Sequence, residues 1–212
     1  MTPANTTSDP GATLSNAFER LGARMSYARE TEVYAQGDRV EMLYRVVRGV
    51  IRTTRFTVEG RRQVGDFYYA GDIFGLEPGP EHRFAAEALT DCEIAVVRRG
   101  AVRAMVGEAE LDRAILEATR EEMERLQDHV VVLGRKSARE RVACFLMSIA
   151  GRQDKGQVDL PMGRQDMADY LGLTIETVSR MLTQLQGDAI VAFPSSRRFE
   201  VRKWHALEAL AA

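Results

Sequence analysis

The sequence has few of the residues that commonly hold metals and cofactors. Its 212 residues include two cysteines, Cys92 and Cys144, and three histidines. Two distant cysteines are too few for a disulfide framework and lack the short spacing of a metal site. We expect both cysteines to be buried thiols. The alternative for Cys144, which lies off the apolar stripe of its segment, is an exposed thiol that can be oxidised. We therefore expect no metal and no cofactor.

Long apolar runs are also missing. No stretch approaches the roughly 18 uninterrupted apolar residues of a membrane-spanning helix. The N-terminal segment MTPANTTSDPGATLSN is small, polar and acidic, unlike a secretory signal, which is basic and then apolar. These features predict a cytoplasmic protein without membrane association.

A global positive charge is absent as well. The 29 Lys and Arg residues stand against 31 Asp and Glu, a net charge of −2, so composition alone does not indicate nucleic-acid binding. The C-terminal part nevertheless holds a local basic patch of Arg197, Arg198, Arg202 and Lys203. With 45% apolar residues, the chain can bury one large or two modest domains.

The first half of the chain is typical of short antiparallel strands. Between residues 31 and 99, short apolar runs are separated by glycine turns that recur every 11 or 12 residues. This spacing predicts a sandwich, barrel or jelly roll, and we assign it to a sensor-like domain over residues 16–106. Residues 1–15 contain turn formers and few large apolar groups, which predicts a flexible tail.

The segment 107–136 lacks proline and is rich in helix formers, which predicts one long helix. Its apolar positions alternate in steps of three and four, like the seam of a coiled coil. These positions are Leu116, Thr119, Met123, Leu126, Val130 and Leu133. We interpret them as a dimer interface; the alternative is a helix packed on its own domain.

Residues 137–212 combine helices with a terminal hairpin pattern, which predicts a winged helix-turn-helix and an α+β protein overall. In the expected motif, Arg164–Leu171 is the first helix, Gly172 supplies a left-handed turn, and Thr174 caps the second helix. The second helix should bury one stripe of apolar side chains. That stripe consists of Val178, Met181, Leu182 and Leu185.

The opposite face of the second helix carries polar groups suited to reading bases. Arg180 can donate to guanine O6 and N7, Glu176 can accept from cytosine N4, and Ser179 can contact a neighbouring base. The alternative is that Glu176 and Arg180 form an ordinary exposed ion pair. Candidate phosphate contacts are Arg164, Gln165, Thr174, Thr177, Arg197 and Arg198.

From about residue 20 onward, the chain resembles the Crp/Fnr superfamily of bacterial transcription regulators. The segment YLGLTIETVSRMLTQL is similar to the FixK and Fnr branch, whose recognition helix carries E-x-x-S-R, whereas the cyclic-AMP receptor branch has glycine before the arginine. The resemblance implies a β-roll like that of cyclic-nucleotide-binding domains, a long dimer helix and a winged helix-turn-helix. It also implies a TTGA-N6-TCAA palindrome, with Arg180 and Glu176 on the G·C pair and Ser179 on a flanking thymine.

The sensor-like domain departs from the ligand-binding members of that superfamily. Cyclic-nucleotide binders have a glutamate directly after the G-D-x-x-G turn and an Arg-Ser pair downstream. Here Gly71–Gly75 is followed by Leu76, and His82-Arg83-Phe84 stands downstream. We therefore expect no cyclic-nucleotide site.

Other sensory groups lack ligands too. Residues 1–91 contain no cysteine for an Fnr-like iron–sulfur cluster. The scattered His82, His129 and His205 predict structural or solvated rings, not haem ligands, and do not form the histidine cluster of a cupin enzyme.

The resemblance to FixK implies a regulator that carries no prosthetic sensor and performs no catalysis. We expect a homodimer that activates genes for low-oxygen (microaerobic) respiration or nitrogen fixation. Contact with RNA polymerase is expected, with the loops Gln153–Gln157 and Glu77–Arg83 as candidates by family analogy. The alternative is a ligand- or haem-gated member with the same DNA-binding domain.

Overall fold

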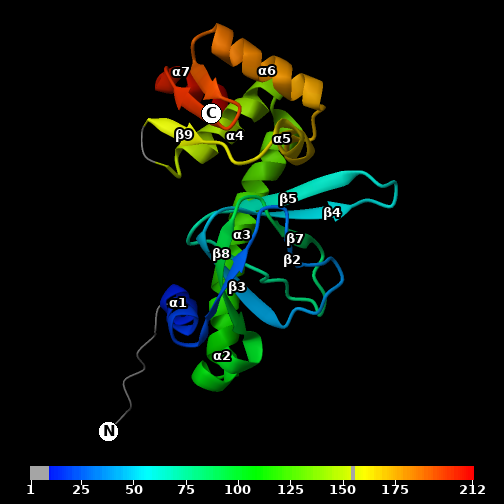
Figure 1. Ribbon diagram of the computed structural model, residues 1–212, viewed down its shortest axis with the longest axis vertical. Coiled ribbons are helices and arrows are strands. Elements are labelled where there is room, and N and C mark those ends of the chain that lie inside the picture. The colour runs from blue at the N-terminus through cyan, green and yellow to red at the C-terminus, as the bar shows by residue number, and fades with distance from the viewer. Residues whose placement is uncertain (1–9, 154–155) are drawn as a thin grey trace. The chain divides into compact units, whose positions relative to one another are not determined.

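The structure is a computed structural model that describes residues 10–153 and 156–212 (Figure 1). The chain divides into two compact units. The first holds Met1–Arg55 and Gly65–Arg125, and the second holds Phe56–Val64 and Leu126–Ala212. This division falls inside the long helix and not at its ends, so the domain boundaries at residues 106 and 136 stay a prediction.

Eight short strands form two four-stranded antiparallel sheets in the roll. The first sheet has the order β1 (Ala23–Tyr27), β8 (Cys92–Arg98), β3 (Met42–Arg48), β6 (Ile73–Phe74). The second has the order β2 (Glu32–Tyr34), β7 (Ala85–Ala88), β4 (Ile51–Phe56), β5 (Arg62–Tyr68). The predicted antiparallel roll is confirmed by these two sheets. Only the turn at Gly60 joins neighbouring strands, β4 and β5, whereas the turns at Gly37, Gly49 and Gly71 each lead from one sheet to the other.

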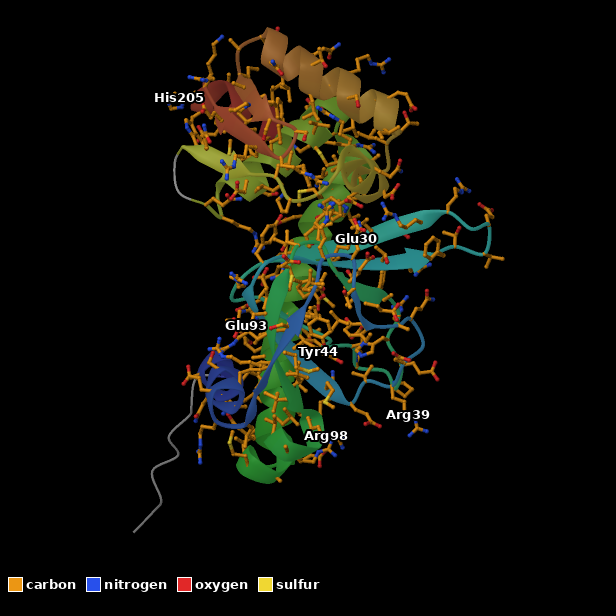
Figure 2. All side chains as sticks on the ribbon, in the orientation of Figure 1. Glu30, Arg39, Tyr44, Glu93, Arg98 and His205 are labelled. Carbon is orange, nitrogen blue, oxygen red and sulfur yellow. The ribbon has the colours of Figure 1, made fainter. Side chains whose placement is uncertain are left out.

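Aromatic side chains fill the interior of the roll. The rings of Tyr34, Tyr44 and Phe74 lie within 6.1 Å of one another, centroid to centroid, in a cluster that also buries Ile51 and Ile94. Tyr44 lies among the strands in Figure 2. Burial of these rings supplies much of the hydrophobic stabilisation of the unit.

Two helices pack on the roll, and the sequence had not indicated either. Helix α1 (Pro10–Leu21) includes residues 10–15, so the prediction of a flexible tail through residue 15 is wrong for them. Leu14 and Phe18 share one face of α1 and are buried in a cluster with Leu43, which is why this segment is helical. Residues 1–9 lie outside the described residues. Helix α2 (Arg99–Val106) buries Val102 in the same cluster.

Helix α3 (Glu108–Arg135) matches the predicted helix over 107–136. Near its start it buries Leu111 and Ala114. Helix α4 (Ala138–Ala150) follows after Ser137, whose side chain accepts from the backbone of Glu140 while the Glu140 carboxylate accepts from the backbone of Ser137. This capping box gives α4 a separate N-terminus directly after α3. In the part of the chain that the structure describes, no helix is long and apolar enough to cross a bilayer.

The C-terminal elements form the expected winged helix-turn-helix. They are β9 (Gln157–Asp159), α5 (Arg164–Leu171), α6 (Ile175–Gly187), β10 (Val191–Ser195), β11 (Arg198–Val201) and α7 (Trp204–Ala211). The sheet has the order β10-β11-β9, and α4 contacts both α6 and α7. Val142, Leu146 and Phe199 are fully buried within this unit.

Candidate nucleic-acid interface

The two helices of the motif are joined by a tight turn that only glycine forms readily. Gly172 has a φ of +61° in the left-handed region, and its N–H donates to the carbonyl oxygen of Ala168. Thr174 then begins the next helix, because its hydroxyl accepts a hydrogen bond from the backbone N–H of Thr177 at 3.2 Å. The predicted turn and cap are both confirmed.

One face of α6 is packed and the other is open. The predicted apolar stripe is buried, with Val178 and Leu185 fully inaccessible. On the other side, Glu176 and Arg180 are exposed and Ser179 is partly exposed. The three predicted base-reading side chains are therefore accessible on one helix whose opposite face is packed in the core of the unit.

Glu176 interacts with the start of its own helix. Hydrogen bonds from its own backbone N–H and from the Thr174 side chain lower the pKa of the Glu176 carboxyl. Among the described residues, Arg180 is not one of the groups that shift the pKa of Glu176, and the choice between base reading and a surface ion pair stays a prediction. Glu176 is an ionised, acceptor-only group at neutral pH.

Three of the predicted phosphate-contact residues line one open hollow. Gln165, Thr174 and Thr177 surround it together with Arg61 and Arg62, which belong to the same compact unit. Sequence reasoning missed the two arginines, because nothing local connects residue 62 to a helix that starts at residue 164. The hollow combines hydroxyl, amide and guanidinium donors, which can bind phosphate oxygens, with the Asp169 carboxylate, which accepts from Arg62 and Gln165.

Arg62 is held by the first helix of the motif. Its guanidinium donates to the Asp166 and Asp169 carboxylates, each at 2.7 Å. Asp166 is buried and also accepts from the backbone N–H of Gly163 at 3.0 Å. Gln165 donates to Asp169 at 2.6 Å, whereas the predicted phosphate contact Arg164 is exposed.

The wing presents the two remaining predicted phosphate contacts, and both have protein partners. The Arg197 guanidinium donates to the carbonyl oxygen of Pro161. Arg198 Nε donates to Asp159 Oδ1 at 2.9 Å, in a pair whose side chains are both more than half exposed. Such an exposed ion pair contributes little to stability, so Arg198 can exchange Asp159 for a DNA phosphate.

The predicted dimer seam is uncovered in the single chain. Leu116 and Val130 are 70% and 66% exposed, and Met123 and Leu126 are also largely accessible. Thr119 and Leu133 are only partly exposed. An apolar stripe of this length on a helix surface is typical of a protein interface.

Two residues at the positions compared with cyclic-nucleotide binders, Leu76 and His82, are packed inside the roll. Leu76, which stands where a glutamate was sought, is buried. His82 is 2% exposed, stacks on Tyr34 with ring centroids 3.7 Å apart, and bonds through Nδ1 to Glu77 at 3.0 Å. Burial alone would raise the pKa of Glu77, but the bond from His82 lowers it overall. The Nε2 of His82 is also buried and has no hydrogen-bond partner among the described residues, and the structural role of His82 stays a prediction.

The remaining candidate sensory residues are structural or solvated too. Cys92 is buried and donates to the carbonyl oxygen of Val50, and half-burial raises the pKa of the Cys144 thiol. His205 points away from its unit (Figure 2). Within residues 10–153 and 156–212, no group of His, Cys, Asp or Glu is placed to hold a metal ion.

Comparison with known proteins identifies the family. Residues 24–109 match the cyclic nucleotide-binding domain and residues 140–210 match the Crp-like helix-turn-helix domain. The nitrogen fixation regulation protein FixK of Azorhizobium caulinodans is 40% identical over 209 residues, covering 95% of this chain and 84% of that protein. The chain belongs to the FixK branch of the Crp/Fnr transcription regulators.

Other FixK proteins agree with this assignment. FixK of Rhizobium meliloti is 42% identical over 87% of this chain and 85% of that protein. The solved structure of FixK2 from Bradyrhizobium japonicum superimposes with a TM-score of 0.85 at 40% identity, over 91% of this chain and 98% of that one. The family consists of DNA-binding regulators, so the expectation of a non-enzymatic protein is confirmed.

Proposed function

We propose that this protein is a cytoplasmic, homodimeric activator that binds a TTGA-N6-TCAA palindrome and controls genes for nitrogen fixation or low-oxygen respiration. The observation that carries the proposal is the exposed trio Glu176, Ser179 and Arg180 on a helix whose other face is buried. The relatives named as nitrogen fixation regulators support the physiological part.

The chemistry of the trio suits one G·C pair and its neighbour. Arg180 presents a planar fork of donors that matches guanine O6 and N7. Glu176 lies one helical turn earlier and accepts from N4 of the paired cytosine, while Ser179 contacts the flanking thymine. A glutamate carboxyl is ionised throughout the neutral range, so this acceptor is present there, and the lowered pKa of Glu176 extends its ionised range toward acidic pH.

Phosphate contacts set the register of the helix in the groove. Thr174 and Thr177 lie at the N-terminus of α6, where backbone N–H groups and the helix dipole favour an anion. Gln165 and Arg164 lie at the start of α5, and Arg197 and Arg198 lie at the wing. These groups bind any sequence, so they add affinity and orientation but no base preference.

The exposed seam supports dimerisation through α3. Pairing two seams would bury Leu116, Met123, Leu126 and Val130 and would present two recognition helices about one DNA turn, roughly 34 Å, apart. A two-fold dimer reads a two-fold site, which is why a palindrome is proposed. Activation further requires contact with RNA polymerase. Glu77–Arg83 is one candidate surface, and the other, Gln153–Gln157, lies partly outside the described residues.

The test is DNase footprinting of the purified protein, without additives, on a TTGA-N6-TCAA fragment. The control is a matched fragment in which the guanine of TTGA and the symmetry-related guanine of the other half-site are replaced. We expect protection of the palindrome alone at physiological salt. Protection only after addition of a cyclic nucleotide, or a Soret band in the absorption spectrum, would instead support a ligand- or haem-gated regulator.

A further inference from the structure

The end of α5 is tied to the dimer helix by side chains. The second compact unit contains residues 126–135 of α3 together with the helix-turn-helix, so this part of the seam and the reading helix belong to one body. His129 lies on α3 beside the seam residues Leu126, Val130 and Leu133. What it contacts is the first helix of the motif.

His129 makes two contacts with Tyr170, in the last turn of α5. Its Nε2 donates to the Tyr170 carbonyl oxygen at 3.1 Å, and the two rings stack with centroids 4.0 Å apart and an interplanar angle of 21°. Phe145 of α4 packs against the same tyrosine ring at 5.6 Å. Burial lowers the pKa of His129, which favours a neutral imidazole in this position.

Arg141 of α4 makes a parallel contact one residue later. Its Nη1 donates to the Leu171 carbonyl oxygen at 3.1 Å, and its Nε donates to the Lys136 carbonyl oxygen at 3.0 Å, just after α3. The last carbonyl groups of a helix have no partner within the helix. Here His129 and Arg141 bind two of them and connect the end of α5 to the end of α3.

The turn between the motif helices lies against the same residues. A Cβ at Gly172 would lie 3.7 Å from Arg141 Nη1 and 3.9 Å from a methyl carbon of Leu133. Leu133 is a seam residue, and α6 starts three residues after this glycine, at Ile175. Because α5 and α6 pack against each other, a rotation of both helices relative to the C-terminal part of α3 would change the His129 and Arg141 contacts with the end of α5.

We propose that His129 and Arg141 are positioning residues that fix the angle between the recognition helix and the dimer helix, and so set the half-site spacing that the dimer accepts. This inference rests on the proposed function, because spacing has meaning only for a dimer on a palindrome. Neither residue touches DNA in this role. They act on spacing and leave base recognition by Arg180 unchanged.

The test compares binding to palindromes whose spacer is shortened or lengthened by one or two base pairs. His129→Leu removes the donor at similar volume, and His129→Gln keeps an N–H donor at similar reach. Asp128→Leu is the matched control, because Asp128 is exposed on the side of α3 away from the seam. Fluorescence anisotropy gives the affinity on each spacer and on a six-base-pair site with the guanine replaced.

We expect the wild type to prefer the six-base-pair spacer by about tenfold or more, equal to about 1.4 kcal/mol. His129→Leu should lose most of that preference while its discrimination at the guanine stays intact. His129→Gln and Asp128→Leu should behave as the wild type. If His129→Leu does not fold, Arg141→Met takes its place, with Arg141→Lys as its conservative partner.

Two results would overturn the inference. A full spacer preference in the folded His129→Leu or Arg141→Met variant would show that these contacts do not set spacing. If these variants lose spacer preference and guanine discrimination together, His129 and Arg141 contribute only to the stability of the DNA-binding unit. If the wild type itself binds no palindrome, the proposed function fails first, and this inference fails with it.

Discussion

The hydroxyl of Thr174 accepts a hydrogen bond from the backbone N–H of Thr177 at 3.2 Å and so closes the first turn of the recognition helix. Thr174→Ala leaves that N–H without its partner and should lower the free energy of unfolding by about 1 kcal/mol. Thr174→Ser keeps the oxygen and should match the wild type. Urea denaturation followed by circular dichroism measures both; equal stability of the alanine variant would show that the cap contributes nothing.

Arg180 should carry most of the discrimination at the guanine. Arg180→Ala should weaken binding to a TTGA-type palindrome by about 1–3 kcal/mol and should bind the guanine-replaced site almost equally well. Arg164→Ala is the matched control, because it removes an exposed arginine of the same unit that is proposed to bind only phosphate. If Arg180→Ala weakens random DNA as much as the palindrome, Arg180 does not read a base.

The wing arginines should contribute through charge alone. Replacing both Arg197 and Arg198 with alanine should weaken binding to all sequences alike and reduce the slope of log affinity against log salt by about one unit for each lost phosphate contact. Arg198 must first leave its exposed pair with Asp159. Titrations at several salt concentrations measure the slope, and an unchanged slope would place the wing away from the phosphates.

The seam on α3 should hold the dimer together. Met123→Glu places a charge in the centre of the exposed apolar stripe, and desolvating it on association would be strongly unfavourable. We expect a monomer in analytical ultracentrifugation and loss of palindrome binding. Val131→Glu adds a charge at an exposed position of α3 outside the stripe and should leave the dimer intact. A stable Met123→Glu dimer would move the interface away from this stripe.

The sequence predicted the reading helix in detail because its signals are local. Gly172 needs a left-handed conformation, Thr174 is a helix cap, and the apolar stripe of α6 repeats at the helical period within a single segment. The glycine spacing likewise predicted the antiparallel roll. The sequence did not predict helix α1, because three apolar residues, Leu14, Ala17 and Phe18, are too few for a clear helical period. The helix is stabilised by burial of these residues against Leu43 and its neighbours, which are distant in the sequence.

Contacts between distant segments could not be predicted. Arg62 and Asp166 are 104 residues apart, and His129 and Tyr170 are 41 apart, so no periodicity or motif connects either pair. In the sequence, His129 and His205 are each a single histidine in a helical segment. Only the packed structure separates the half-buried ring on Tyr170 from the fully solvated one.

That difference predicts a pH dependence of stability. Burial lowers the pKa of His129 below its usual value of 6.5, and nearby Arg141 lowers it further, against the opposing effect of the Tyr170 carbonyl. Below about pH 6.5, the unfolded chain takes up a proton at His129 more readily than the folded chain does. The stability that this histidine contributes is therefore present above that pH and is lost as the pH falls through the lowered pKa.

The free energy of unfolding should fall more steeply between about pH 7 and pH 5 in the wild type than in His129→Gln, which does not titrate in this range. His205→Gln is the control, because it removes an exposed histidine and leaves the contacts of His129 with Tyr170 in place, so the slope should stay that of the wild type. Urea denaturation at each pH measures all three proteins. Parallel curves for the wild type and His129→Gln would mean that His129 stays as easily protonated in the folded chain as in the unfolded one.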